Sequence, residues 1–162
     1  MSARRVLDGL DVKPLLAQLE GINLWNTDDC WIKSGAAYRP DNIPLHYAGH
    51  EKQGFRELTA ARNLIDQLYQ AVAGKQLGKV VGITRMKPGE VLAPHVDSTM
   101  KPPQFERYQI PLAVPNGVEF VVGGELFDMQ PGEAWWFDKT VEHSVANYSS
   151  ADRISIVVEI RS

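Results

Sequence analysis

Cysteine is nearly absent from this sequence of 162 residues, which contains only Cys30. A single cysteine cannot form a disulfide within the chain, and it also excludes a structural zinc site built from several cysteines. A reducing compartment suits such a composition, although a cysteine-poor secreted protein would look the same. We interpret Cys30 as a small buried hydrophobic residue, which is the default for a free thiol.

Long hydrophobic runs are also missing. The apolar stretches are short and rich in β-branched residues, and they fall far below the ~20 residues that a membrane-spanning helix needs. The N-terminal segment MSARRVLDGLDV contains two arginines but no apolar core, so it does not have the pattern of a secretory signal. The sequence therefore predicts a cytoplasmic protein without a membrane partner.

Neither sign of charge dominates the chain. Its 17 Lys and Arg residues and 20 Asp and Glu residues give a formal net charge of −3, and like charges do not cluster into long runs. A nucleic-acid-binding domain usually needs a basic surface that neutralises phosphates. We therefore expect no nucleic-acid partner, and the length fits one compact domain over residues 1–162.

The chain changes character near residue 79. Residues 1–78 are expected to be helical and irregular, with a short helix that begins after Asp11 and ends at Gly21. Apolar residues then recur at steps of three and four from about Phe55 to Val72, which is the period of a helix with one buried face. Residues 22–54 show no clear period, and we interpret them as irregular structure with two short strands at most.

Residues 79–162 favour short β-strands rich in Val, Ile, Phe and Trp, separated by Pro-Gly, Asn-Gly and Gly-Gly turns. Many short strands with such turns are typical of an antiparallel sandwich or jelly roll. We therefore predict a mainly β fold, with a jelly-roll core and the N-terminal helices on one outer face. The expected strands are Lys79–Met86, Val91–Val96, Arg107–Val114, Glu119–Val122, Glu125–Met129, Ala134–Phe137, His143–Asn147 and Arg153–Ile160.

Three residues on these strands form a candidate metal site. His95 and Asp97 are two positions apart at the end of a strand, so their side chains point to the same face and can bind one ion together. His143 begins a later strand, which a jelly roll can bring opposite the first. Two imidazoles and one carboxylate on one side of an ion are the facial triad of non-haem iron(II) oxygenases. His46 and His50 show no such pattern.

Arg153 begins the last strand, RISIVVEIR, which is apolar on both faces and is expected to be central and buried. A buried cation is unfavourable without a partner anion, and a dicarboxylate cosubstrate could supply that anion. A guanidinium can bind such a carboxylate through two hydrogen bonds. The alternative is that Arg153 starts its strand in solvent, paired with Glu142 or Asp152.

From Gly82 onward the sequence resembles the aspartyl/asparaginyl β-hydroxylase-like 2-oxoglutarate oxygenases. The resemblance implies a double-stranded β-helix (a cupin-like jelly roll), and iron(II), 2-oxoglutarate and O₂ as cofactors, with ascorbate as a candidate addition. It places His95 and His143 on the iron-binding histidines, and Arg153, Thr84 and Arg107 on residues of the cosubstrate site. The matching stretches are ITRMKPGEVLAPHVD, RYQIPLAV, the Gly-Glu of VVGGELF and MQPGEAWWFDKTVEHSVANYSSADRISIVVEIR.

One departure from that family concerns Asp97. Vertebrate peptidyl members have glycine at this position and lack the carboxylate ligand, whereas here the triad of His95, Asp97 and His143 is complete. A complete triad is closer to the prolyl-hydroxylase-like members. The departure therefore leaves the expected reaction type unchanged and leaves the substrate open.

The function that the resemblance implies is hydroxylation of an unactivated C–H bond in a small molecule or peptide, such as a free amino acid or an amino-acid residue. Candidate substrate contacts are Arg39, His46, Tyr47 and Arg56. Two other hypotheses remain: a cupin-like metalloenzyme that does not use 2-oxoglutarate, and a non-catalytic jelly-roll module that binds a small ligand. The oligomeric state is not indicated by the sequence.

Overall fold

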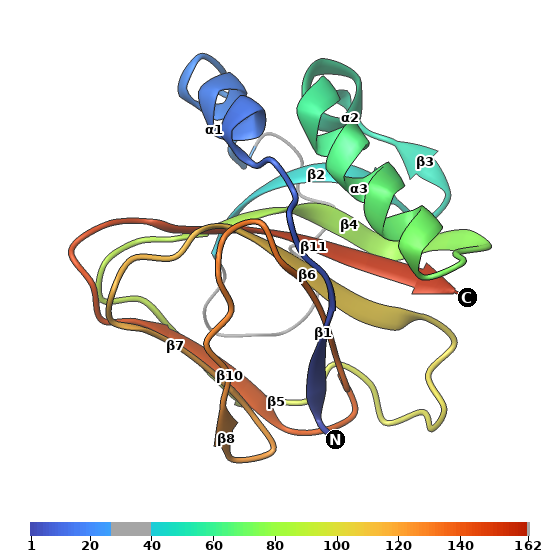
Figure 1. Cartoon of the computed structure of the whole chain (residues 1–162), viewed down its shortest axis with the longest axis vertical. Helices are drawn as coiled ribbons and strands as arrows, with labels where there is room; N and C mark the ends of the chain where they lie inside the picture. The colour runs from blue at the N-terminus through green and yellow to red at the C-terminus, as the bar shows by residue number, and fades with distance from the viewer. Residues whose placement is uncertain (27–39, 162) are drawn as a thin grey trace.

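A computed structural model describes residues 1–26 and 40–161, in which helices cover one face of two stacked β-sheets (Figure 1). The larger sheet has seven strands in the order β1-β9-β6-β11-β4-β2-β3, and the smaller has four in the order β5-β10-β7-β8. The predicted mainly β jelly roll with flanking helices is thereby confirmed. The elements are β1 Ala3–Leu7, α1 Lys13–Glu20, β2 Asp41–Tyr47, β3 His50–Glu51, α2 Gln53–Glu57, α3 Thr59–Ala71, β4 Gln76–Met86, β5 Val91–His95, β6 Glu106–Ala113, β7 Val118–Val122, β8 Glu125–Leu126, β9 Ala134–Phe137, β10 His143–Asn147 and β11 Arg153–Arg161.

Strand β11 lies in the middle of the larger sheet, between β4 and β6. Successive side chains of a strand point to opposite faces. One set of β11 residues packs in the core beneath the helices: Ile154, Ile156, Val158 and Ile160. Arg153, Ser155 and Glu159 alternate with them and are buried on the opposite face, toward the smaller sheet. The strand is therefore central and buried, as its sequence predicted.

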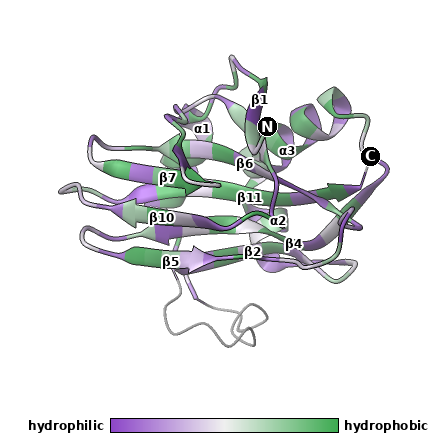
Figure 2. Cartoon of the chain, turned by 90° about the horizontal axis from the view of Figure 1, so that it is seen from below, coloured by the Kyte–Doolittle hydropathy of each residue, from purple (hydrophilic) through white to green (hydrophobic). Residues whose placement is uncertain are grey.

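Two separate apolar cores follow from this alternation. The larger core fills the space between the helices and the seven-stranded sheet, and includes Leu15 of α1 and Leu68 of α3. The smaller core lies between the two sheets, and includes Phe137 of β9 and Val145 of β10. In the view from below, β5, β10 and β7 run side by side and each carries both hydrophobic and hydrophilic residues (Figure 2). One face of each strand can therefore pack in an apolar core while the other face carries polar side chains.

The helix expected from Phe55 to Val72 is two helices, because the chain leaves helical geometry at Leu58 (φ −94°, ψ 73°). The first backbone N–H groups of a helix need outside partners. Gln18 of α1 supplies one, since its Oε1 accepts a hydrogen bond from the Ala60 N–H at 3.1 Å while its Nε2 donates to the Thr59 hydroxyl at 3.0 Å. The break is thus stabilised by a contact between helices that apolar periodicity does not reveal. Within the described residues, no helix is long and apolar enough to cross a membrane.

Residues 1–78 contribute more β-structure than expected. Strand β1 pairs with β9 and forms one edge of the larger sheet, while β2 pairs with β4 near the opposite edge. Strand β1 contains Arg4 and Arg5, and charged residues are common on edge strands, where they discourage pairing with another chain. The change of character near residue 79 is therefore not a boundary within the sheet.

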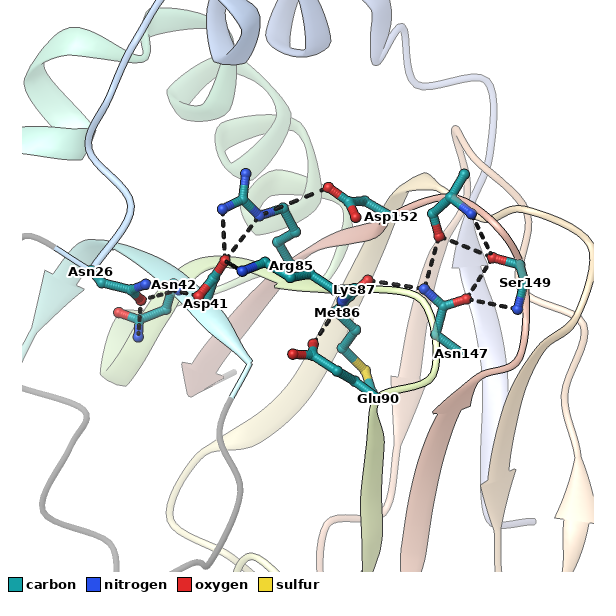
Figure 3. Close-up of polar contacts among 11 residues, drawn as sticks. Asn26, Asp41, Asn42, Arg85, Met86, Lys87, Glu90, Asn147, Ser149 and Asp152 are labelled. Atoms are coloured by element: carbon teal, nitrogen blue, oxygen red, sulfur yellow. Dashed lines mark hydrogen bonds and ion pairs between the residues drawn. The ribbon is translucent and has the colours of Figure 1, made fainter.

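Asn147, at the end of β10, joins the two sheets (Figure 3). Its side chain has no exposed surface, and its Nδ2 donates hydrogen bonds to the backbone carbonyls of Met86 and Ala151, both at 2.9 Å. Its Oδ1 accepts a hydrogen bond from the Ser149 hydroxyl at 2.6 Å. These bonds attach the turn between β10 and β11 to the end of β4, and so hold His143 and Arg153 in a defined relation across the two sheets.

Candidate metal centre

His95 and His143 lie directly opposite each other on β5 and β10. Opposed residues of an antiparallel pair place their side chains on the same face, and here the two ring centroids are 4.4 Å apart. The Nδ1 atom of His95 is 2.7 Å from the Ala93 carbonyl oxygen, and that of His143 is 2.9 Å from the Val141 carbonyl oxygen. Carbonyl partners favour a proton on Nδ1, so Nε2 of each ring is the atom that can bind a metal ion once it carries no proton of its own.

Asp97 completes the group just after β5. Its Oδ1 is 3.5 Å from Nε2 of His95 and its Oδ2 is 3.5 Å from Nε2 of His143. One ligand atom from each of the three residues lies within 4.8 Å of the others, and no second group of this kind occurs in the part of the chain that the structure describes. Two nitrogen donors and one carboxylate suit iron(II), and three protein ligands leave room for a cosubstrate.

The charge state of Asp97 suits this role. Burial alone would raise the pKa of its carboxyl, but hydrogen bonds with His143 and His95 and the positive charge of Arg107 hold the pKa far below its usual range. The hydrogen bond with Asp97 raises the pKa of His95 against the opposing effect of burial. Asp97 is therefore ionised at neutral pH and available as a metal ligand.

Arg153 is buried on the inner face of the larger sheet, with 5% of its surface exposed. Its Nη2 donates a hydrogen bond to Oε1 of Gln109 at 2.8 Å, and no carboxylate among the described residues lies within ion-pair distance of it. Burial lowers the pKa of Arg153 to about 10, so the guanidinium is still a cation at neutral pH. The burial excludes the alternative in which Arg153 starts its strand in solvent; Asp152 instead lies 3.9 Å from Arg85 (Figure 3).

Hydroxyl and amide groups surround this arginine on the same face. Thr84 of β4 is the register partner of both Ser155 on β11 and Asn42 on β2, so these three buried side chains lie in a row across the sheet. The Thr84 hydroxyl donates to the Ser155 carbonyl at 3.4 Å, whereas Oγ of Ser155 and Oδ1 of Asn42 are buried without a hydrogen-bond partner among the described residues. Unpaired buried polar atoms are rare in proteins and often mark a ligand site.

Of the buried polar residues on this face of the sheet, sequence reasoning singled out Arg153 and Thr84 but not Gln109, Asn42 or Ser155. Ser155 could have been found, because it follows Arg153 by two residues on the same strand and so shares its face. Gln109 and Asn42 depend on strand register, which the sequence did not specify.

Arg107, on β6, lies beside the triad. Its Nη1 is 3.1 Å from Oδ2 of Asp97 and its Nη2 is 3.1 Å from Oε1 of Glu159, while its buried Nε has no hydrogen-bond partner. Arg107 and Lys139 also line a hollow of about 200 Å³ between the loop after β5 and the end of β9. That hollow adjoins the three candidate metal ligands through Arg107.

The candidate substrate contacts lie elsewhere. Tyr47 and Arg56 belong to the edge of the larger sheet formed by β2, β3 and α2, where Arg56 donates to the Glu51 carbonyl and Tyr47 lies near Lys79. His46 is on the same strand and is paired in register with Glu51. No contact joins these three residues to the triad within the described ranges. Arg39 and Cys30 lie outside the described residues.

Comparison with solved structures shows the same fold in proteins of low sequence identity. A 2OG-Fe(II) oxygenase family oxidoreductase from Burkholderia pseudomallei has a TM-score of 0.68 and 16% identity, over 99% of this chain and 84% of that one. A prolyl hydroxylase from Trichoplax adhaerens, bound to a hypoxia-inducible-factor peptide, has a TM-score of 0.66 and 12% identity, over 99% and 83%. A viral collagen prolyl hydroxylase from Paramecium bursaria Chlorella virus-1, in complex with 2OG, has a TM-score of 0.64 and 14% identity, over 100% and 96%.

The family assignment comes from the sequence itself. Comparison with curated protein sequences finds no significant match. The sequence profile described as aspartyl/asparaginyl beta-hydroxylase, however, matches residues 22–162, which is most of the chain. The resemblance seen in the motifs is thereby confirmed over a longer range, and with it the assignment as an iron(II)- and 2-oxoglutarate-dependent hydroxylase. The chain belongs to the aspartyl/asparaginyl β-hydroxylase family.

Proposed function

We propose that the protein hydroxylates an unactivated C–H bond of a free amino acid or of an amino-acid residue in a peptide. One observation carries this proposal: a complete triad of His95, Asp97 and His143 lies on and just after strands of the smaller sheet, and Arg153 is buried in the larger sheet with no carboxylate partner among the described residues. A metal ligand set alone would suit many enzymes. The buried cation adds a specific requirement for an anionic ligand, and 2-oxoglutarate has that charge.

The proposed roles of the residues follow from their chemistry. The triad binds iron(II), and Arg153, Thr84 and Ser155 bind the far carboxylate of 2-oxoglutarate. When bound, iron and 2-oxoglutarate supply the oxidation, in which O₂ is consumed, 2-oxoglutarate becomes succinate and CO₂, and one oxygen atom converts the substrate C–H to C–OH. The surrounding apolar side chains, such as Phe137 and Val145, exclude water from this space.

The energetic argument concerns Arg153. Transfer of a guanidinium from water into a protein interior costs several kcal/mol unless an anion and hydrogen bonds offset the loss of hydration. In the described residues Gln109 supplies one neutral acceptor, and Met86 contributes only a sulfur at 4.0 Å. A bound carboxylate would supply charge and two acceptor oxygens, which fits a site whose function is to bind a dianion.

The amino-acid class of the substrate is supported by the family to which the chain belongs. The hollow of about 200 Å³ beside Arg107 is a candidate position for part of this substrate, because Arg107 contacts the metal ligand Asp97 directly. Trp136 and Lys139 also line it, so that it presents both an apolar surface and a positive charge.

Anaerobic absorption spectroscopy tests the cofactor chemistry. We expect a visible charge-transfer band when the protein is titrated with iron(II) and then 2-oxoglutarate. The band should be lost in His143→Ala and should require far more 2-oxoglutarate in Arg153→Ala. His50→Ala is a matched control, because His50 is exposed on β3 and is not part of the triad.

A substrate search can then use succinate release as its readout, with free amino acids first and short peptides next. Release that depends on a particular amino acid, accompanied by a product 16 mass units heavier, would establish the reaction. Folded, iron-loaded protein that gives no charge-transfer band would contradict the use of 2-oxoglutarate.

A further inference from the structure

Four charged residues, one of them the proposed metal ligand Asp97, form a closed ring of contacts, here called the charged ring: Asp97, Arg107, Glu159 and Lys139. Nη1 of Arg107 is 3.1 Å from Oδ2 of Asp97, and Nη2 of Arg107 is 3.1 Å from Oε1 of Glu159. Nζ of Lys139 lies 2.7 Å from the same Glu159 oxygen. The backbone carbonyl of Lys139 then accepts a hydrogen bond from the Asp97 N–H at 2.9 Å, which closes the ring.

The ring comes from four different parts of the fold. Asp97 follows β5 of the smaller sheet, whereas Arg107 and Glu159 face each other on β6 and β11 of the larger sheet. Lys139 follows β9. The ring therefore ties the end of β5 to the larger sheet through both the backbone and the side chain of Asp97. A metal ligand that ends a five-residue strand would otherwise depend on that strand alone for its position.

The ring is partly buried, and its charges balance. Glu159 and Lys139 are 5% and 8% exposed. The side chains of Arg107 and Asp97 keep 14% and 21% of their surface exposed, and two positive groups face two negative ones. Burial would raise the pKa of Glu159, but the charge of Arg107 and the hydrogen bond from Lys139 lower it, so the carboxyl is ionised at neutral pH. The second Glu159 oxygen accepts a hydrogen bond from the Val80 N–H at 3.0 Å. Glu159 is thus a fixed anchor for Arg107.

Strand β4 is shaped to admit this anchor. A Cβ atom at Gly78 would lie 2.4 Å from Cβ of Glu159, which no real pair of atoms tolerates. The small residue at position 78 therefore lets β4 pass Glu159 closely enough for the Val80 N–H to reach it.

We propose that Arg107 is a positioning residue for the metal centre: fixed by Glu159 and Lys139, it holds Oδ2 of Asp97 so that the carboxylate presents Oδ1 to the ion. This inference rests on the proposed metal-binding role of the triad, and it gives Arg107 a function that does not require contact with the cosubstrate. Groups that hydrogen-bond to metal ligands typically change metal affinity by about 10–100-fold when they are removed.

Charge and position make opposite predictions for Arg107→Gln. Removal of a cation near a divalent ion would tighten metal binding if charge dominated. Loss of the contact with Asp97 would weaken binding if positioning dominated. We expect weaker binding, with a dissociation constant for cobalt(II) that rises about 10–100-fold. Arg107→Lys keeps the charge but can replace only one of the two contacts, so it should lie between Arg107→Gln and the unmodified protein.

The experiment is a titration of the whole chain with cobalt(II), in which calorimetry and visible absorption measure binding. Neither 2-oxoglutarate nor substrate is present. Circular dichroism verifies that each variant is folded. Arg5→Gln is the matched control, because Arg5 forms a surface ion pair with Glu133 at 2.7 Å on β1, and it should leave cobalt affinity unchanged. Glu159→Gln, which removes the anchor, should weaken binding in the same direction as Arg107→Gln.

A second background separates positioning from general damage to the fold. In an Asp97→Gly chain the remaining histidines bind cobalt more weakly, and Arg107→Gln should then add no more than about a twofold change, because the carboxylate on which it acts is gone. An equal loss in both backgrounds, or tighter binding in Arg107→Gln, would overturn the inference. If the unmodified chain binds no divalent ion, the proposed function falls with it; if that chain binds cobalt and Arg107→Gln binds equally well, only the role of Arg107 falls.

Discussion

The two faces of the larger sheet have the same strands but opposite chemistry. Toward the helices, β11 presents an unbroken set of aliphatic side chains, and the residues of β4 and β6 that pack beside them are also apolar, among them Val81, Ile83, Tyr108 and Ile110. Toward the smaller sheet, the same strands present Arg153, Ser155 and Glu159 from β11, with Thr84 from β4 and Arg107 from β6. Burial is nearly complete on both faces, so exposure alone does not distinguish them.

The two faces differ in whether their buried groups need hydrogen-bond partners that the protein does not supply. Apolar side chains against the helices contribute about 25 cal/mol per Å² of surface removed from water and have no unmet requirement. On the inner face the polar atoms Oγ of Ser155 and Oδ1 of Asn42 have no hydrogen-bond partner in residues 1–26 and 40–161. Buried polar atoms without a partner cost about 1–3 kcal/mol each. One face of the sheet therefore stabilises the fold, while the other retains a cost that a ligand can offset, and substitutions on the two faces should have opposite effects on stability and binding.

The largest effect on metal binding is expected for a substitution in the smaller sheet, which contributes His143 to the proposed metal site. His143→Ala removes a nitrogen ligand from the centre of the triad and should abolish iron binding at micromolar metal together with all succinate release. The folded state should persist, because Phe120 and Val145 around it remain packed. Calorimetric titration with iron(II) under anaerobic conditions measures this. Iron binding as tight as in His50→Ala would exclude His143 as a ligand.

Ile156→Ala tests the face toward the helices. Ile156 is fully buried in the larger core, and truncation of such a side chain typically costs about 4 kcal/mol of unfolding free energy. The affinity of the folded protein for 2-oxoglutarate should change by less than about twofold, since the side chain points away from the site. Urea denaturation and an anaerobic 2-oxoglutarate titration give the two values. A large loss of affinity with little loss of stability would contradict the division between the faces.

Arg153→Met tests the opposite face of the same strand. The substitution removes two charge-assisted hydrogen bonds to the proposed carboxylate, so 2-oxoglutarate affinity should fall about 100-fold, which corresponds to about 2.7 kcal/mol. The ligand-free chain should unfold at the same or higher urea concentration, because a buried cation has been replaced by an apolar side chain of similar length. Arg62→Met is a suitable control, because Arg62 pairs with Glu51 on the surface at 2.9 Å. Strong destabilisation of Arg153→Met without any change in 2-oxoglutarate affinity would show that Arg153 is structural.

The contrast between the faces also explains which parts of the site the sequence could predict. The spacing of His95 and Asp97 was enough to predict that both would face one ion, although β5 ends at His95, and each strand predicted after residue 79 lies within a few residues of an observed one. Arg153 was identifiable because a charge in an apolar strand is unusual. These signals come from residues that are close together in the chain, so a single sequence is enough to show them.

Other features depend on contacts between distant segments. Glu159 lies opposite Arg107 only because β11 and β6 pair in one register, and Lys139 reaches it from a loop. The interruption at Leu58 depends on Gln18 from another helix, and β1 depends on a free edge of β9. Strand register and helix docking are set by the whole core, so these features were not accessible from periodicity.

The smallest effect, and the sharpest test of the comparison, is expected for Ser155→Ala. The Ser155 hydroxyl is fully buried and has no partner, so its removal should raise the unfolding free energy of the ligand-free protein by about 1 kcal/mol. The same substitution should weaken 2-oxoglutarate binding about fivefold, because a hydrogen bond to the carboxylate is lost. Ser149→Ala is the matched control: its hydroxyl donates to Oδ1 of Asn147 at 2.6 Å, so loss of the same atom should destabilise the fold and leave 2-oxoglutarate binding unchanged. Opposite signs for two identical chemical changes, measured by urea denaturation, would show that the unpaired hydroxyl is retained for its ligand. If Ser155→Ala and Ser149→Ala destabilise the protein equally, the inner face is as fully satisfied as the outer one, and its polar atoms no longer indicate a binding site.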